Sequence, residues 1–122
     1  EAEAEQAAEV IKLEVDLRLN DLKTQEGSMS KEDYINARIK IKSITVDFSV
    51  IGDSGGRDDD LQQIDGIDDS LEKRLNTLGI STLDQLSKMD DEMSDVVNDA
   101  IEYMPGRIRR QLWSDQAKIL LE

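Results

Sequence analysis

The sequence contains no cysteine and no histidine among its 122 residues, and it has only one proline and one tryptophan. Without cysteine the chain can form no disulfide and offers no thiolate nucleophile, and the usual side-chain ligands of structural zinc are missing. Histidine is the commonest general base in enzymes, so its absence removes the side chain on which most acid–base catalysis depends. We therefore expect no enzyme activity, no catalytic residues, no metal site and no cofactor.

Long hydrophobic runs are also absent, since no apolar stretch approaches the roughly 20 residues that a membrane-spanning helix needs. No signal peptide is recognisable either. The lack of cysteine fits a reducing compartment, so a cytoplasmic protein is expected. The sequence begins at Glu1 instead of methionine, and association with a membrane is expected only if an upstream segment is missing.

Acidic residues outnumber basic residues by 28 to 15, and the formal net charge is −13. A field of this sign repels nucleic acid and anionic lipid at long range, so nucleic acid is not the expected partner. The acidity has a second interpretation, which is that it keeps the protein soluble. Aromatic residues make up only 3% of the sequence, so the core is expected to be aliphatic.

The segment 10–22 fits two local structures. Its apolar and charged residues alternate, which is typical of a strand. Wound as a helix, the same residues form two apolar stripes, and such a helix lies between two neighbours. One stripe contains Val10, Leu13 and Leu17, and the other contains Ile11, Val15, Leu19 and Leu22. We favour the helix, because the preceding run of Ala and Glu has high helix propensity, and a strand over residues 10–20 remains the alternative.

A second helix is expected after a turn at Gly27. The residues from Ser30 to Asp33 have the pattern of a capping box, which marks the beginning of a helix. Apolar residues then recur every three or four positions, which indicates the seam of a helix that continues to Ile51. These residues are Tyr34, Ala37, Ile41, Ile44, Phe48 and Ile51. A strand over residues 44–50 is the alternative, because this stretch also alternates.

Residues 1–52 are thus predicted to form a helical hairpin, which is too thin to bury a core by itself. We expect it to be an oligomerisation or docking segment, covered by another protein or by a second copy in a homo-oligomer. Within it, residues 17–37 resemble the family of short C-terminal domains called SHOCT, and the resemblance implies a role in oligomerisation or docking. The resemblance is carried by Leu19, Leu22, Gly27, Ser30, Glu32 and Tyr34.

Residues 53–60 form an acidic linker that is rich in Gly and Asp and has no apolar residue. The three aspartates at its end suggest a calcium loop. However, the alternating oxygen ligands and the distal glutamate of an EF-hand are missing. We expect these aspartates to cap the helix that follows.

Several short helices are predicted over residues 61–122, and each boundary has a local signal. The expected boundaries are a hairpin at Asp65–Ile67, a helix end at Gly79, a capping box from Thr82 to Gln85, a cap at Asp90 or Asp91, a helix end at Pro105–Gly106 and a final helix from Ile108 to Leu121. The apolar residues of the helix before Pro105 are expected to run from Met93 to Met104.

This half of the chain resembles the helix-hairpin-helix family. The resemblance is carried by Leu61, Ile64, Gly66, Ile67, Leu71, Leu75, Gly79, Ile80 and Thr82, and then by Pro105–Ile108, Arg110, Trp113 and Gln116–Lys118. The second group is similar to a variant found as an extension on bacterial proteins, among them a peripheral subunit of respiratory NADH dehydrogenase and a large-subunit ribosomal protein. The resemblance implies a compact, SAM-like helix-hairpin-helix domain at residues 61–122, so the whole chain is expected to be all-α.

In DNA-binding members of that family, the hairpin presents backbone N–H groups to a phosphate, and it reads Gly-hydrophobic-Gly before basic residues. Here the hairpin residues are Asp65, Gly66, Ile67 and Asp68, with an aspartate in place of the second glycine. Carboxylates at these positions would occupy the amides that a phosphate needs. We therefore expect a hairpin kept for packing, and a helix-hairpin-helix nucleic-acid-binding module is the alternative function.

A basic cluster at Arg107, Arg109 and Arg110 stands out in the acidic chain. Arg107 and Arg110 are one helical turn apart, so they share a face. They either form internal ion pairs with nearby aspartates, such as Asp95 and Asp99, or dock a carboxylate-rich partner surface. We predict partner binding by Arg107, Arg110 and Trp113, although a lone tryptophan is more often a core residue. The predicted function is a non-catalytic protein–protein interaction or assembly module, an accessory or scaffold subunit of a larger complex.

Overall fold

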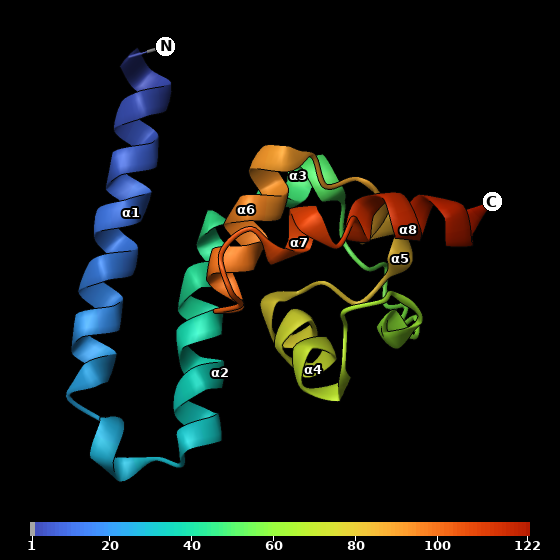
Figure 1. Ribbon diagram of the computed structural model, residues 1–122. Coiled ribbons are helices and arrows are strands. Elements are labelled where there is room, and N and C mark those ends of the chain that lie inside the picture. The colour runs from blue at the N-terminus through green and yellow to red at the C-terminus, as the bar shows by residue number, and fades with distance from the viewer. Residues whose placement is uncertain (1) are drawn as a thin grey trace.

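The computed structural model describes the backbone from Ala2 to Glu122 and the side chains from Val10 onward. Throughout this part of the chain the regular structure is helical and no strand occurs, so the predicted all-α class is confirmed (Figure 1). The α-helices are α1 Ala2–Lys23, α2 Lys31–Lys42, α3 Phe48–Ile51, α4 Asp69–Leu78, α5 Leu83–Ser87, α6 Asp91–Ala100, α7 Arg107–Arg110 and α8 Trp113–Leu121, and the 3-10 helices are η1 Glu26–Ser28, η2 Ser43–Thr45 and η3 Leu61–Gln63. No helix among the described residues has the length and apolarity needed to cross a membrane.

Helices α1 and α2 form the predicted hairpin, and α1 lies along one edge of the molecule (Figure 1). The favoured prediction of a helix over residues 10–20 is therefore confirmed, and the strand alternative is wrong. The Ser30 side chain accepts a hydrogen bond from the backbone N–H of Asp33 at 3.0 Å, which caps the beginning of α2 as expected. Val15 and Leu22, from one apolar stripe of α1, are buried. The stripe that contains Leu13 stays exposed, so between Val10 and Leu22 one side of α1 is covered and the other is not.

The prediction that the second helix continues to Ile51 is wrong, because α2 ends at Lys42. Side chains compete with the helical backbone at this point: Ser43 Oγ donates to the Lys40 carbonyl at 2.6 Å, and Thr45 Oγ1 donates to the Lys42 carbonyl at 2.7 Å. A 3-10 turn follows, and Val46 then takes an extended conformation. The alternative of a strand over residues 44–50 is wrong as well, since α3 begins at Phe48.

Asp47 starts α3 by capping it. Its Oδ1 accepts hydrogen bonds from both the hydroxyl and the backbone N–H of Ser49. These two hydrogen bonds stabilise the ionised carboxylate, and they lower the pKa of Asp47 below its ordinary value. The redirected chain brings Phe48 to Gly79, where a Cβ on the glycine would lie 2.9 Å from Phe48 Cζ.

One hydrophobic core joins the two halves of the chain. Ile39 and Ile51 are completely buried, and they belong to the same cluster as the apolar residues of α4 to α8. The cluster is Ile39, Val46, Ile51, Leu61, Ile64, Ile67, Leu71, Leu75, Leu78, Ile80, Leu83, Leu86, Met89, Met93, Val97, Ala100, Ile101, Ile108, Trp113 and Ala117. The hairpin at residues 1–52 is thus packed on the C-terminal half. The division of the whole chain into separate domains at residues 53–60 stays a prediction.

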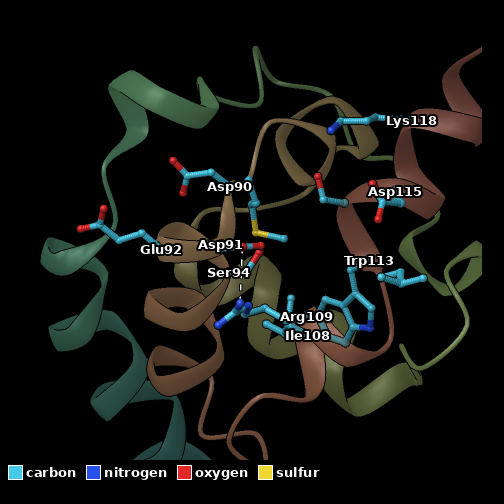
Figure 2. Close-up of a pocket in the computed structure, with 12 residues that line it drawn as sticks. Asp90, Asp91, Glu92, Ser94, Ile108, Arg109, Trp113, Asp115 and Lys118 are labelled. Atoms are coloured by element: carbon cyan, nitrogen blue, oxygen red, sulfur yellow. Dashed lines mark hydrogen bonds and ion pairs between the residues drawn. The ribbon is translucent and has the colours of Figure 1, made fainter.

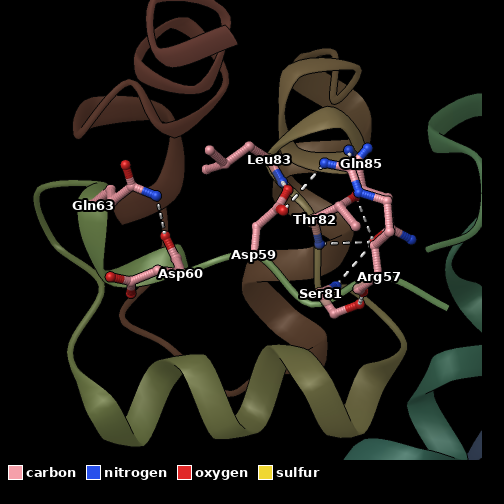
Figure 3. Close-up of polar contacts among 8 residues, drawn as sticks. All are labelled: Arg57, Asp59, Asp60, Gln63, Ser81, Thr82, Leu83 and Gln85. Carbon is pink, nitrogen blue, oxygen red and sulfur yellow. Dashed lines mark hydrogen bonds and ion pairs between the residues drawn. The ribbon is translucent and has the colours of Figure 1, made fainter. Parts of the chain in front are cut away.

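Gln85 also connects the halves, through a buried amide (Figure 3). Its Nε2 donates to the carbonyls of Gly52 and Gly79, at 3.0 and 3.1 Å, so one side chain holds the ends of both α3 and α4. Its Oε1 accepts from the backbone N–H of Thr82 and completes the predicted capping box. The predicted helix end at Gly79, which has a φ of 113°, is likewise confirmed.

The predicted linker is exposed at Gly55, Gly56 and Asp58, but its end is anchored (Figure 3). The backbone N–H of Asp59 donates to the Ser81 carbonyl at 2.8 Å, and Asp59 Oδ2 accepts from the Leu83 N–H at 2.9 Å. Asp60 Oδ1 accepts from the Gln62 N–H at 3.0 Å, so an aspartate of this segment caps the following helix as predicted.

Two predicted helix limits near the C-terminus are wrong. The helix expected to reach Met104 ends at Ala100, because Glu102 takes a left-handed backbone conformation with a φ of 59°. The expected final helix from Ile108 to Leu121 is broken into α7 and α8, because Leu112 also has a positive φ, of 57°. Such conformations are uncommon for residues other than glycine, and so the sequence carries no clear signal for either break.

Candidate functional site

The predicted hairpin lies directly over the break between α7 and α8. Gly66 has a φ of 108°, a conformation that side chains other than glycine rarely adopt. A Cβ at this position would overlap the side-chain oxygen of Gln111 and lie 3.0 Å from Trp113 Nε1. Gly66 therefore meets two requirements at once, a left-handed backbone and a close approach to the C-terminal half.

The backbone groups of the hairpin are occupied by other parts of the chain. Asp68 Oδ1 accepts from the Leu71 N–H at 2.8 Å and so caps α4. The Asp65 N–H donates to Gln116 Oε1 at 2.8 Å, while Gln116 Nε2 donates back to the Asp65 carbonyl at 3.2 Å. Ile67, the remaining hairpin residue, is buried in the core. The arrangement supports the interpretation that this hairpin serves packing, because a carboxylate already occupies the start of the helix.

The loop between α6 and α7 is organised by Asn98, a residue that sequence reasoning missed. Asn98 is 4% exposed, and its Nδ2 donates to the carbonyls of Tyr103 and Met104 at 3.1 and 3.0 Å. Its Oδ1 accepts from the backbone N–H of Ile108 at 2.9 Å. A polar residue on the apolar face of a predicted helix was the available signal, since buried polar groups nearly always have hydrogen-bond partners.

The three arginines of the basic cluster do not behave alike. Arg109 forms an ion pair with Asp91 at 3.3 Å (Figure 2). It forms a second ion pair with Asp95, also at 3.3 Å. The expectation of internal pairing with Asp95 is thus met by Arg109 alone. Within the described residues, neither Arg107 nor Arg110 forms an ion pair with a carboxylate.

Arg107 and Arg110 both turn toward the loop that precedes α7. Arg107 Nη2 lies 3.6 Å from the sulfur of Met104, and Arg107 Nε is buried with no hydrogen-bond partner in the described part of the chain. Arg110 Nη2 donates to the Pro105 carbonyl at 3.0 Å, and Arg110 Nε donates to the Gly106 carbonyl at 3.3 Å. Both predicted partner-binding arginines therefore lie against the loop 104–106, and neither forms an ion pair with a described carboxylate.

Trp113 belongs to the core, which corrects its expected role in partner binding. Its exposed fraction is 0%, so it has no surface to offer a partner. Its Nε1 donates to Gln111 Oε1 at 2.9 Å, and its ring stacks on Tyr103 with the ring centroids 5.8 Å apart. Trp113 is the first residue of α8, directly after the break at Leu112.

Two large apolar side chains, one on each side of α7 in the sequence, are exposed instead. Met104 is 54% exposed and Leu112 is 55% exposed. Met104 contacts Arg107, whereas Leu112 follows the last turn of α7 after Gln111 and lines a groove together with Arg109. We call Met104, Arg107, Arg110 and Leu112 the α7 patch. A cationic surface with adjacent exposed aliphatic side chains has the composition of a protein-docking site.

A groove of about 530 Å³ is lined by Arg109 and by Leu112 of the α7 patch (Figure 2). Its polar lining includes Asp90, Asp91, Glu92, Asp115 and Lys118. Asp90 is committed to capping α6, since its Oδ1 accepts from the Met93 N–H at 2.7 Å. The hydroxyl of Ser114, another polar residue of the lining, donates to the Ser87 carbonyl at 3.1 Å.

Comparison with known proteins gives one clear result for the C-terminal half. The family model described as the RS2/RL21/YNQ2 HHH domain matches residues 61–121, half of the chain. This match confirms the helix-hairpin-helix resemblance, whereas the SHOCT resemblance of residues 17–37 lies outside the matched range and stays a prediction. No match to the chain is found among curated proteins or among solved structures.

Proposed function

This chain belongs to the RS2/RL21/YNQ2 HHH domain family, and from that premise we propose that it is a non-catalytic protein–protein interaction module. The family occurs in ribosomal proteins and in proteins of a respiratory complex, which are subunits of larger assemblies. We infer that this chain is likewise an accessory or scaffold subunit, and that it docks its partner through the α7 patch.

The observation that carries this proposal is that no described carboxylate forms an ion pair with Arg107 or Arg110. The sequence has 28 acidic residues, yet the ion pairs of the region are made by Arg109. Asp91 lines a pocket with Gly106 and Arg110, but its ion pair is with Arg109. More distant carboxylates are screened over about 8 Å at physiological ionic strength. An acidic group of a partner would pair with the guanidinium groups, and the apolar side chains of Met104 and Leu112 would be buried beside it.

The alternative function, nucleic-acid binding, is disfavoured by the hairpin. A phosphate would approach the first turn of α4, where the Asp68 carboxylate already accepts the Leu71 N–H. Asp65 and Asp69 add negative charge on either side of the same position. The chain's net charge of −13 acts in the same direction at longer range.

The proposal is tested by reversing the charge of the patch in the full chain. Wild type, Arg107→Glu/Arg110→Glu and a control, Lys31→Glu/Lys40→Glu, would be compared as baits in quantitative capture of interacting proteins. Lys31 and Lys40 are exposed, and the control changes the net charge by the same amount. We expect a partner that is retained by the control and depleted about tenfold or more by the patch variant. A partner held equally by both variants would refute the role of the α7 patch.

A parallel titration with duplex DNA and duplex RNA separates the two functions. The interaction-module proposal expects no binding at micromolar concentration in physiological salt. Micromolar binding whose affinity falls steeply with added salt would replace the proposal with nucleic-acid recognition, because phosphate contacts release counterions.

A further inference from the structure

Helix α1 carries an apolar stripe that this chain leaves uncovered. Val10, Leu13 and Leu17 are 60%, 61% and 68% exposed, and their spacings of three and four residues place them in one line along the helix. We call these three residues the α1 stripe. Figure 1 shows α1 at the edge of the molecule with α2 on its inner side. Contiguous exposed aliphatic side chains on such an edge mark a surface for another molecule.

The other stripe of α1 is buried at two positions, so the exposed stripe is not a consequence of a detached helix, although Ile11 at the start of the inner stripe is 38% exposed. Val15 and Leu22 are 7% and 9% exposed. Val15 and Ile11 line an apolar groove between α1 and α6, together with Val96. The inner stripe thus holds α1 against the body of the protein and presents the α1 stripe outward in a defined orientation.

The charges beside the α1 stripe are acidic. Positions three or four residues away are neighbours on a helix surface, and for the stripe these positions include Glu14, Asp16 and Asp21. All three are exposed, and between Val10 and Lys23 no basic residue occupies a neighbouring position of this kind. Arg18 forms an ion pair with Glu14 at 2.6 Å, but it lies on the far side of Glu14 from the stripe.

These flanks discriminate between possible occupants. Two copies of the chain packed stripe against stripe would bring acidic residues face to face in either orientation, because Glu14 and Asp21 flank one side and Asp16 the other. Like charges at the flanks of a helix pair oppose pairing, whereas opposite charges favour it. A partner helix with basic flanks is not repelled by these acidic residues. Its Lys or Arg side chains would pair with them, while its apolar residues cover the α1 stripe.

We propose that the α1 stripe docks an amphipathic helix of a different protein, with an aliphatic seam bordered by Lys or Arg. The occupant uses the helix-pairing mode of recognition, in which residues at three- and four-residue spacings anchor the complex. This surface is formed by a different element from the α7 patch and attracts a partner of the opposite charge. The chain is then an adaptor with two faces, one for an acidic partner surface and one for a basic helix.

The test uses the full chain and three synthetic helical peptides as probes. The first peptide has leucines at alternating three- and four-residue spacing with lysine flanks, the second has the same seam with glutamate flanks, and the third is a scramble of the first. We expect the lysine-flanked peptide to bind about tenfold or more tightly than either of the others at physiological salt. Equal binding of the scrambled peptide, or no binding of the lysine-flanked peptide, would overturn the proposal.

Variants then locate the binding site. Val10→Ser/Leu13→Ser/Leu17→Ser should weaken binding about tenfold or more with unchanged circular dichroism, because all three side chains are exposed. The matched control is Ile119→Ser/Leu120→Ser/Leu121→Ser, since these aliphatic residues of α8 are also exposed, at 67%, 42% and 46%. Glu14→Lys/Asp16→Lys/Asp21→Lys should reverse the preference between lysine and glutamate flanks. An equal loss in the α8 control, or an unchanged preference in the charge variant, would contradict the assignment.

Sedimentation of the wild-type chain tests whether a second copy of the chain, instead of a different protein, covers the α1 stripe. We expect a monomer, because the acidic flanks disfavour pairing of the α1 stripe with itself. A dimer that the stripe variant converts to monomer would show that the second copy is the occupant and would overturn the proposal of a basic helix.

Discussion

Gly66 lies directly against the side chain of Gln111, 45 residues later in the sequence. This contact joins the hairpin at Asp65–Asp68 to the break before α8. Gln111 Oε1 is itself fixed, because it accepts hydrogen bonds from Trp113 Nε1 at 2.9 Å and from the Tyr103 hydroxyl at 3.3 Å. The side chain that faces Gly66 therefore has little freedom to move aside. The hairpin, the α6–α7 loop and the C-terminal helix thus depend on one another.

Gly66→Ala is expected to destabilise the protein by about 1–3 kcal/mol, since the new Cβ requires a strained positive φ and displaces Gln111. Urea unfolding followed by fluorescence measures the effect, because Trp113 is the only tryptophan. Gly27→Ala is the control, as a Cβ on Gly27 has nothing within 4 Å and its φ is not positive. Equal unfolding midpoints for wild type and Gly66→Ala would show that the hairpin does not pack as described.

Asn98→Ala is expected to cost about 2–4 kcal/mol, because it leaves two loop carbonyls and the Ile108 N–H without their partner. The loop that carries Met104 should also become more mobile, which amide hydrogen exchange over residues 101–108 would detect. Asn76→Ala is the matched control, since Asn76 is exposed and lies on α4. A stability change of less than about 0.5 kcal/mol for Asn98→Ala would indicate that water replaces its hydrogen bonds.

Trypsin is expected to cut first after Arg57, whose side chain is 68% exposed in the segment 53–58. The two fragments should remain together in native gel filtration, because Ile39 and Ile51 are buried in the core that the C-terminal helices complete. Separation requires denaturant if this core is shared. Spontaneous separation of folded fragments would instead support two autonomous domains divided at residues 53–60.

Asp47 is expected to make stability depend on pH in the acid range. Its folded pKa is lowered by the hydrogen bonds from Ser49, so its contribution is present above the unfolded pKa, about 3.9, and is lost as the pH falls through the lower folded pKa. The difference in unfolding free energy between wild type and Asp47→Ala should therefore shrink from pH 7 to pH 3. Asp58→Ala, at an exposed linker aspartate, should show no comparable trend. A difference that stays constant with pH would exclude the capping role.

Local signals in the sequence predicted the elements whose causes are local. The cap at Thr82, the helix end at Gly79 and the start of α2 at Ser30 each depend on residues within a few positions, and all three predictions are confirmed. The two-stripe pattern of α1 also predicted a helix with two distinct apolar sides. Periodicity was sufficient in these cases because tertiary contacts act in the same direction as local preference.

Features with competing or distant causes escaped prediction. At Ser43 and Thr45 the apolar periodicity continues, but hydroxyl-to-carbonyl hydrogen bonds end the helix. Leu112 takes a left-handed conformation although it is not a glycine, so the sequence gives no signal for it. Trp113 is buried against Gln111 and Gly66, which are far apart in the sequence. The α7 patch was predicted through its arginines, whereas its apolar members, Met104 and Leu112, became recognisable only once these breaks were known.

The shared core has a consequence for biosynthesis. Ile39, Val46 and Ile51 leave the ribosome before the helices that cover them, because those helices begin only at Asp69. At about 5–20 residues per second, synthesis of the following 60 or so residues takes roughly 3–12 s. During that interval the nascent chain presents these aliphatic residues without their covering partners, and it does so on the same emerging hairpin that carries the α1 stripe. The rate of translation therefore sets how long these aliphatic residues lack the helices that cover them in the folded protein.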